Sequence, residues 1–200
     1  MSPPLLTTMR CLEIGPGKHR VSGFETLDVI KRKNVDHVGN AQHLPFRDNT
    51  FATIYASHVL EHIPWIETQR AVDEWVRCLA HGGRLEVWVP DALRVARAFV
   101  EAEDNAASYG CRRPVEAIIT DPLWHANAEH DPCVWFASRT FTWHHRRMGE
   151  YSWHRAAFTP RYLCLVLERA GLTNVRIMDI SEMRLPAHLW VSLGACGVKP

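Results

Sequence analysis

The chain alternates short apolar runs with segments of helical periodicity, and this alternation constrains its fold more than any other feature. Strand-like apolar runs bounded by turn residues lie at 9–14, 24–30, 35–39, 51–57 and 84–90. Apolar residues at helical spacing follow at 66–80, closed by Gly82-Gly83, and from Asp91 to about residue 103. Strands that alternate with helices form right-handed crossovers, so we predict a doubly wound, mostly parallel sheet with helices on both faces.

The alternation of strands and helices stops at residues 104–157, to which we assign no elements, and resumes after them. Thr159-Pro160 is a good N-cap and N1 pair and predicts a helix up to Ala170. Two last apolar runs, at 174–180 and 188–194, predict a terminal antiparallel pair of strands. The expected fold is therefore α/β, with seven strands, an antiparallel terminal strand and an insert after the fifth strand.

The length of 200 residues suits one domain with a substantial core. We therefore expect a single domain over residues 1–200, with 104–157 as a lid over the substrate. Six scattered cysteines without a C-x-x-C pair, an N-terminus without a signal-peptide pattern and no long apolar span favour a cytoplasmic protein. The formal net charge of +1 gives no broad field to attract nucleic acid or a membrane surface.

A glycine turn follows the first predicted strand, in the stretch "CLEIGPGKHRVSGFETLDV". Ligands of open parallel sheets bind at the carboxyl ends of the strands, and glycines there let the backbone approach the ligand. The dinucleotide fingerprint needs a third glycine leading into a helix, but Arg20 stands at that position and no helical periodicity follows. Asp28, at the end of the second strand, can accept hydrogen bonds from a ribose diol. An adenosine without phosphates fits both facts, and S-adenosylmethionine is the common ligand of this kind.

Each of these signals has a structural alternative, since a G-x-G after a strand is frequent and a strand-end aspartate is often a cap. Further motifs along the chain decide between the structural and the ligand-binding interpretation. The stretch "LEIGPG", with Asp28, "GNAQHLPF", "FATIYASHVLEHI" and "RCLAHGGRLEVWVP", resembles the class I S-adenosylmethionine-dependent methyltransferases in order and spacing over about residues 10–100. It is most similar to small members in which the first motif runs almost directly to the second strand. The resemblance implies a Rossmann-like fold and S-adenosyl-L-methionine as the cofactor.

The resemblance also implies which residues bind the cofactor. Glutamate and glycines of the first motif would line the methionine portion, the acid would hold the ribose, and the loop after the third strand would border the adenine. The expected cofactor-binding residues are Glu13, Ile14, Gly15, Pro16, Gly17, Asp28, Val29, Asn40, Ala41, Gln42, Leu44 and Ser57. Two departures stand out: Ala52 replaces a common aspartate, and the shortened first crossover leaves one sheet face less covered, which favours a homodimer.

Methyl transfer from a sulfonium is an in-line displacement, so the protein mainly supplies alignment and a dry pocket. A base is needed where the nucleophile must lose a proton, and histidine suits that task. His58 follows the fourth strand at the ligand edge, and His154 matches a position where relatives often carry histidine; both are candidate bases. For His62, beside Glu61, we favour a structural role.

The insert holds histidines and tryptophans at high density: His125, His130, His144, His145 and His154, with Trp124, Trp135, Trp143 and Trp153. We interpret it as a lid whose rings stack on a sugar or another ring; the alternative is a surface segment held by its own tryptophans. The run "HANAEHDPC" contains ligand types for zinc or iron. Its two histidines lie about 140° apart around a helix and do not match H-E-x-x-H, so we expect no metal.

The leading hypothesis is an enzyme that methylates oxygen or nitrogen of a small molecule rich in hydroxyl groups or amines, such as a sugar, glycan precursor or specialised metabolite. A small-molecule substrate is expected, with no membrane partner and with nucleic acid disfavoured. A protein or RNA methyltransferase and a non-catalytic S-adenosylmethionine-binding subunit of a heteromer are the alternatives. A dehydrogenase is a poor third interpretation, because the third glycine and its helix are missing.

Overall fold

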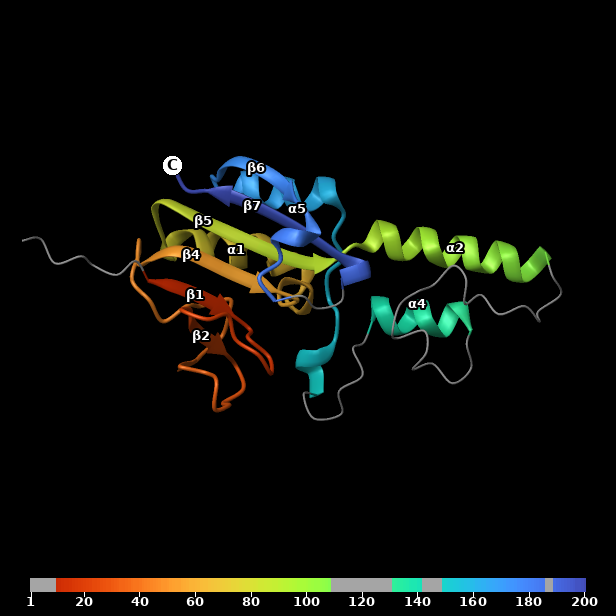
Figure 1. Ribbon diagram of the computed structural model, residues 1–200, viewed down its shortest axis with the longest axis horizontal. Helices are drawn as coiled ribbons and strands as arrows, with labels where there is room; N and C mark the ends of the chain where they lie inside the picture. The colour runs from red at the N-terminus through yellow and green to blue at the C-terminus, as the bar shows by residue number, and fades with distance from the viewer. Residues whose placement is uncertain (1–9, 109–130, 142–148, 186–188) are drawn as a thin grey trace, which may run out of the picture.

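The structure is a computed structural model and describes residues 10–108, 131–141, 149–185 and 189–200. Its seven strands are β1 (Cys11–Ile14), β2 (Glu25–Asp28), β3 (His37–Val38), β4 (Phe51–Ser57), β5 (Leu79–Pro90), β6 (Thr173–Met178) and β7 (Ser192–Val198). They form one sheet in the order β3-β2-β1-β4-β5-β7-β6 (Figure 1). The strands from β3 to β5 pair in parallel, whereas β7 pairs antiparallel with both β5 and β6. The predicted Rossmann-like, mostly parallel seven-stranded sheet with an antiparallel terminal strand is confirmed.

The long helices begin where the sequence offers caps. They are α1 (Thr68–Cys78), α2 (Ala92–Ser108), α4 (Pro132–Thr140) and α5 (Pro160–Arg169). Asp91 caps α2 by accepting hydrogen bonds from the backbone of Leu93 and Arg94, at 3.0 and 3.1 Å. Thr159 caps α5. Helix α4, inside the insert, begins at an Asp131 cap followed by proline, a pattern that the sequence analysis left unassigned.

Some element bounds differ from the sequence-based expectation. Helix α1 ends at Cys78, ahead of Gly82-Gly83, because Leu79 already pairs with Phe51 in the sheet. The last strand begins at Ser192, after a 3₁₀ helix at Leu189–Val191.

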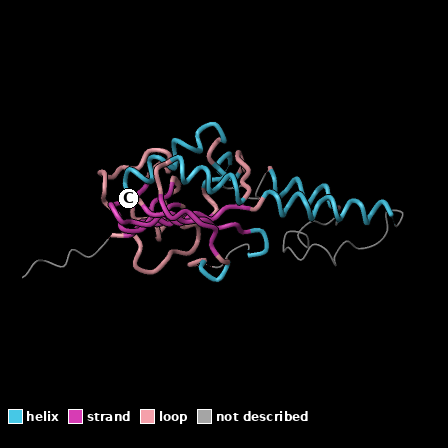
Figure 2. Tube along the Cα trace, turned by 90° about the horizontal axis from the view of Figure 1, so that it is seen from above, coloured by secondary structure: helices cyan, strands magenta, loops and turns pink. Residues whose placement is uncertain are grey.

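Helices α1 and α5 pack on one face of the sheet and form the main core with it. Its largest members include Leu12, Ile14, Phe51, Ile54, Trp75, Phe158, Leu163 and Leu167. The other face holds a smaller cluster: Val21, Phe24, Tyr55, Trp88, Met178, Met183 and Cys196. That face is covered by the β1–β2 loop and by the segment after β6. Figure 2, with the sheet edge-on, shows helices mainly on one side of the sheet and mostly loops on the other.

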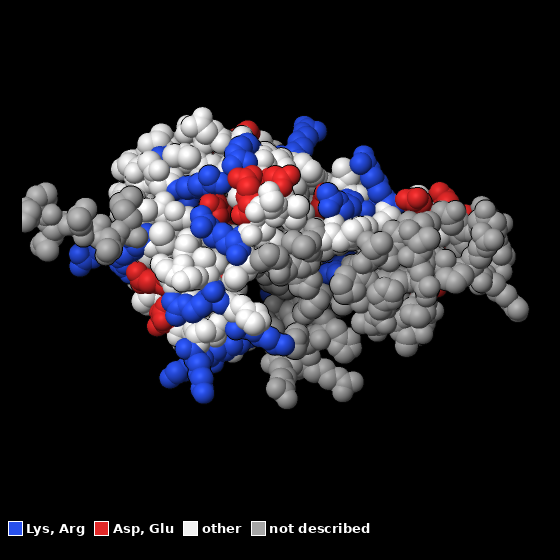
Figure 3. Space-filling view, in the orientation of Figure 1, with Lys and Arg blue, Asp and Glu red and all other residues white. Residues whose placement is uncertain are grey.

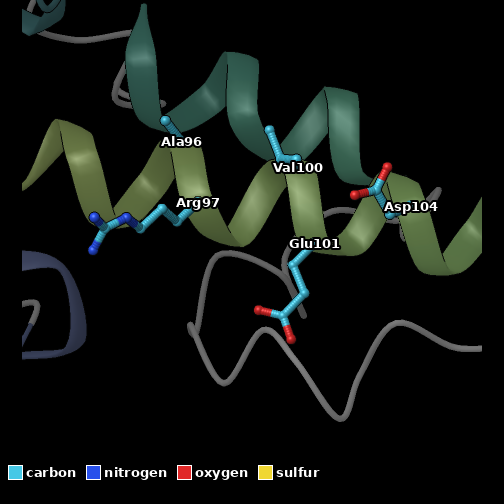
Figure 4. A pocket seen from close by; sticks show the side chains of 5 residues that line it. All are labelled: Ala96, Arg97, Val100, Glu101 and Asp104. Atoms are coloured by element: carbon cyan, nitrogen blue, oxygen red, sulfur yellow. The ribbon is translucent and has the colours of Figure 1, made fainter.

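Helix α2 extends past the end of the sheet and packs beside α4 (Figures 1 and 2). The two helices share a separate apolar cluster in which Trp135 is fully buried against Val95 and Ala102. A hollow of about 560 Å³ lies along α2, where Ala96, Arg97, Val100, Glu101 and Asp104 line it (Figure 4). None of the described helices is long and apolar enough to cross a membrane.

Candidate active site

The glycine turn after β1 has the backbone geometry that only glycine adopts readily. Gly15 and Gly17 have φ of 68° and 59°, and the Gly15 N–H donates to the carbonyl of Leu27 at 2.8 Å. A Cβ on Gly15 would lie 2.3 Å from Cγ2 of Val59, whereas a Cβ on Gly17 would meet nothing within 4 Å. Gly15 is therefore needed for packing against the segment after β4, and Gly17 leaves open space beside the turn.

Glu13 holds the loop that replaces the first crossover helix. Its side chain is 3% exposed, and Oε2 accepts a hydrogen bond from the backbone N–H of Val21 at 2.7 Å. Asn34 donates to the carbonyl of Gly17 at 3.2 Å. Burial raises the pKa of Glu13, although the Val21 N–H and the charge of Arg20 oppose this effect. The carboxylate thus stabilises the loop between β1 and β2 through its hydrogen bond with Val21.

Asp28 lies at the end of β2, as the ribose contact requires. Its Oδ1 accepts from the backbone N–H of Ile30 at 2.9 Å, and its Oδ2 accepts from Arg32 at 2.7 Å. A carboxylate offers about four lone-pair sites, so two donors still leave room for a ribose diol. The neighbouring Val29 is 37% exposed and offers an apolar surface at the same edge.

Residues 40–44, where we expect the adenine, contact helix α1 and the main core. Asn40 Oδ1 accepts from the backbone N–H of Gln42 at 2.9 Å, and the carbonyl of Ala41 accepts from the indole of Trp75 at 2.7 Å. Leu44 is buried in the core. The loop is therefore held in a defined conformation beside β3.

Three further predicted contacts differ in what they can offer a ligand. Ile14 is 1% exposed and its side chain belongs to the core, so only its backbone remains for a ligand. Pro16 is buried within the turn, and Ser57 is half-buried at the end of β4. The open turn at Gly17 and the carboxylate of Asp28 fit S-adenosylmethionine.

A histidine–glutamate cluster forms just beyond β4, from His58, Glu61, His62 and His154. His58 has a left-handed backbone, with φ of 55°, and leads into the 3₁₀ helix η1 (Leu60–His62). The backbone N–H groups of Arg155 and Ala156 both donate to the carbonyl of Glu61, at 2.7 and 3.1 Å. These two bonds bring the end of the insert against η1 and place His154 beside His62, with ring centroids 5.0 Å apart.

Glu61 is the centre of this cluster. It is 1% exposed, and its Oε1 lies 3.2 Å from Nδ1 of His58 and 4.0 Å from Nε2 of His62. Burial opposes ionisation, but the hydrogen bond from His58 and the charges of the three histidines outweigh it and lower the pKa of Glu61 to about 2. Burial also lowers the pKa of His154, against the attraction of Glu61. The surroundings therefore favour the ionised form of Glu61, while burial disfavours the charged form of His154.

His58 also reaches toward a second hollow. Its Nε2 lies 3.0 Å from Oγ of Ser192, and Ser192 lines a hollow of about 530 Å³. Side chains from the ends of β5, β6 and β7 and from the start of α2 surround the hollow, including Trp88, Asp91, Arg94, Met178 and Trp190. A histidine at the carboxyl end of β4 is thus connected to a cavity at the same end of β5.

The two predicted bases, His58 and His154, meet in one cluster. Glu61 was seen in the sequence only as a neighbour of His62, and the H-x-x-E-H spacing of "SHVLEHI" was the available signal for its role. His125, His130, His144, His145, Trp124, Trp143 and most of "HANAEHDPC" lie outside the described residues. Of the insert's aromatic residues, Trp135 is fully buried between α2 and α4, whereas Trp153 is 55% exposed.

Comparison with known proteins agrees with this architecture. A family model described as a methyltransferase domain matches residues 20–87. No curated protein sequence matches the chain. Many solved structures do, although their sequence identity is low.

Three of these solved structures show the extent of the likeness. A methyltransferase from Thermotoga maritima, described as a possible histamine N-methyltransferase, is 18% identical, with a TM-score of 0.55 over 98% of this chain and 84% of its own. A methyltransferase from Archaeoglobus fulgidus is 11% identical, with a TM-score of 0.53 over 96% and 86% of the two chains. The 1,6-didemethyltoxoflavin-N1-methyltransferase of Burkholderia thailandensis, solved with S-adenosylhomocysteine, is 13% identical, with a TM-score of 0.53 over 94% and 70%.

These likenesses establish the fold, and the family match covers the segment that contains Asp28, the adenine loop and β4. The open glycine turn and the carboxylate at the end of β2 fit S-adenosylmethionine as the cofactor. Residues 20–87 thus match a methyltransferase domain, and the chain has the fold of S-adenosylmethionine-dependent methyltransferases.

Proposed function

We propose that the protein methylates an oxygen or nitrogen of a small molecule rich in hydroxyl groups or amines, such as a sugar, a glycan precursor or a specialised metabolite. One observation carries the proposal: His58 joins the end of β4 to the hollow at the ends of β5 and β7 through Ser192. That hollow, of about 530 Å³, has the size of a small-molecule site. The names of the similar N-methyltransferases from Thermotoga maritima and Burkholderia thailandensis point to the same class of acceptor.

S-adenosylmethionine supplies an activated methyl group on a sulfonium. An acceptor would attack this carbon in line, and the carbon–sulfur bond would break with its electron pair left on sulfur, giving S-adenosylhomocysteine. The Gly15–Gly17 turn and Asp28 hold the donor, while the hollow aligns the acceptor and excludes water from it.

His58 takes the proton that a hydroxyl acceptor must lose. Its Nδ1 faces the carboxylate of Glu61, so in the neutral ring Nδ1–H donates to that carboxylate and Nε2 is the nitrogen that can accept a proton. This is the arrangement in which a buried carboxylate orients a histidine base. Nε2 contacts Ser192 on the wall of the hollow. We assign the base to His58 rather than His154, because the ring of His154 packs against His62.

The test is methyl transfer from labelled S-adenosylmethionine to a panel of sugars, aminosugars and phenolic or amine metabolites. Loss of a general base costs about 10²- to 10⁴-fold in rate, so we expect His58→Gln to lower kcat to this extent. The affinity of the His58→Gln variant for S-adenosylhomocysteine should equal that of the wild type. His81→Gln, at an exposed histidine whose Nδ1 contacts the carbonyl of Pro200, is the matched control and should keep full activity.

Full turnover by His58→Gln would contradict the base assignment. A wild-type protein that binds the cofactor but methylates no small molecule would contradict the acceptor class, and the panel would then pass to protein and RNA.

A further inference from the structure

Glu61, His62 and His154 offer a set of metal ligands, of which the proposed methyl transfer uses only Glu61, to orient His58. Each of the three residues has a ligand atom within 4.8 Å of those of the other two. Metal bonds of about 2.0–2.2 Å hold neighbouring ligands about 3–3.5 Å apart, so the three atoms need to close by about an ångström. Rotation of two histidine side chains can supply that movement. They are the only such group among the residues that the structure describes.

Hydrogen bonds orient both histidines as they are oriented in metal sites. His62 Nδ1 lies 3.1 Å from the carbonyl of Trp153, and His154 Nδ1 lies 2.9 Å from the carbonyl of Arg139. A carbonyl only accepts, so each Nδ1 must carry a proton, and in the neutral imidazole each Nε2 then keeps a lone pair for a metal ion. A backbone carbonyl on the second nitrogen is the usual outer-shell partner of a metal-binding histidine.

One oxygen of the Glu61 carboxylate is available to a metal ion. Oε1 faces His58, but Oε2 is buried and finds no hydrogen-bond partner among the described residues. An unpartnered oxygen on a fully buried carboxylate is costly. A cation bound at this oxygen would remove that cost. His62 retains an exposed edge, with 23% of its side chain accessible, and this edge gives an ion a path of entry.

We propose that Glu61, His62 and His154 bind one divalent transition-metal ion, with Zn²⁺ as the best match. Two imidazole nitrogens and one carboxylate oxygen suit zinc, whereas Mg²⁺ and Ca²⁺ prefer sets made of oxygen alone. Three protein ligands leave a fourth position open, which is the pattern of catalytic rather than structural zinc.

The site stands beside His58, just after the carboxyl end of β4. An acceptor hydroxyl bound there would lose its proton more readily, because the ion lowers the pKa of the oxygen that it holds. This last step rests on the proposed function; binding of the ion does not.

The experiment is calorimetric titration of Zn²⁺ into protein freed of metal by a chelator, with Co²⁺ as a spectroscopic probe. The chain has twelve histidines, so stoichiometry and matched variants are needed to separate this site from surface binding. We compare the wild type with Glu61→Gln and His154→Gln, and use His81→Gln as the control. Each preparation is also titrated with S-adenosylhomocysteine.

We expect the wild type and His81→Gln to bind one equivalent of Zn²⁺ and to give the visible absorption of tetrahedral Co²⁺. An outer-shell partner is worth about 10- to 100-fold in metal affinity, so losing a direct ligand should cost at least about 100-fold. Both cluster variants should lose the Co²⁺ spectrum. Retained cofactor binding by His154→Gln would show that this loss is local.

Wild-type protein that binds S-adenosylhomocysteine but no stoichiometric Zn²⁺ would overturn the metal site and leave the methyltransferase function intact. Equal Zn²⁺ affinity in the wild type and both cluster variants would overturn it too. Zn²⁺ binding without cofactor binding would instead contradict the proposed function and support the ion site.

Discussion

Gly15 shows how a single residue connects the turn after β1 to the segment after β4. Its positive φ and its contact with Val59 come from two different requirements. The first is the sharp turn after β1, and the second is the close approach of the segment that carries His58. A substitution at Gly15 therefore affects both the turn and the cluster.

We expect Gly15→Ala to destabilise the fold and weaken cofactor binding. The left-handed backbone costs about 1–2 kcal/mol for a residue with a Cβ, and overpacking against the stiff Val59 adds about 1–3 kcal/mol. Gly23→Ala is the matched control, because Gly23 has a φ of 79° with nothing within 4 Å of an added Cβ. Urea unfolding of the two variants separates the cost of the left-handed backbone from the cost of the contact with Val59. Equal losses of stability would show that the contact with Val59 adds nothing.

The candidate bases show what single residues reveal in a sequence. His58 could be placed because a residue after a parallel strand must lie at the ligand edge. The role of Glu61 could not, since it depends on the backbone bonds from Arg155 and Ala156, which are nearly a hundred positions away. Such tertiary contacts decide whether a charged residue is buried, and the local periodicity of the sequence does not predict them.

At the scale of elements, a strap after β6 takes the place of helices on one face of the sheet. The strap consists of residues 179–185 and includes the 3₁₀ helix η5 (Ile180–Glu182). Arg184 pins it, with two bonds to the carboxylate of Glu86 on β5 at 2.7 and 2.8 Å. The same guanidinium lies over the ring of Phe24 in the β1–β2 loop, 5.0 Å from its centroid. Strap, sheet and loop thus meet at one side chain.

We expect Arg184→Gln to destabilise the protein by about 2 kcal/mol, measured by urea unfolding. Removing one partner of a buried ion pair costs about 3–5 kcal/mol, and the partial exposure of Arg184, at 35%, reduces this figure. Glu86 is 3% exposed and would lose its bidentate partner. The control is Arg176→Gln, which removes an exposed pair with Glu182 and should have little effect. Similar losses in both variants would contradict the pinning role.

The elements themselves were mostly predictable, and the exceptions have physical causes. Strands β1, β2, β4 and β5 and helices α1, α2 and α5 follow from apolar periodicity and capping residues. The end of α1 did not, because the pairing of Leu79 with Phe51 outweighs the stop signal of the two glycines. The strap has little periodicity, since ion pairs of Glu182 and Arg184 hold it together with the buried Met183, without a regular apolar stripe.

At the scale of the molecule, the regions proposed for the donor and the acceptor lie along one edge of the sheet. The glycine turn and Asp28 follow β1 and β2, while the hollow with Ser192 lies where β5 and β7 meet. The cluster around Glu61 follows β4, which stands between them in the sheet. The substrate-lid role of residues 104–157 and the homodimer stay predictions.

Basic side chains gather over the part of the molecule that carries β2 (Figure 3). Exposed cations in the neighbouring loops include Lys18, Arg20, Lys31 and Lys33. The patch is local, since the formal net charge of the whole chain is only +1. An acceptor with an acidic group would be attracted to this end, so phosphorylated and carboxylated sugars belong in the acceptor panel.

The central claim is that this fold binds S-adenosylmethionine through the turn after β1 and the carboxylate after β2. Calorimetric titration with S-adenosylhomocysteine tests it most directly, with Asp28→Asn as the variant and Arg32→Gln as the control that removes only the ion pair. Loss of charge-assisted bonds to the ribose diol should weaken binding by about 10- to 100-fold in Asp28→Asn, while the wild type and Arg32→Gln bind well. Equal affinity in all three would contradict the ribose contact, and no binding by the wild type would contradict the account itself.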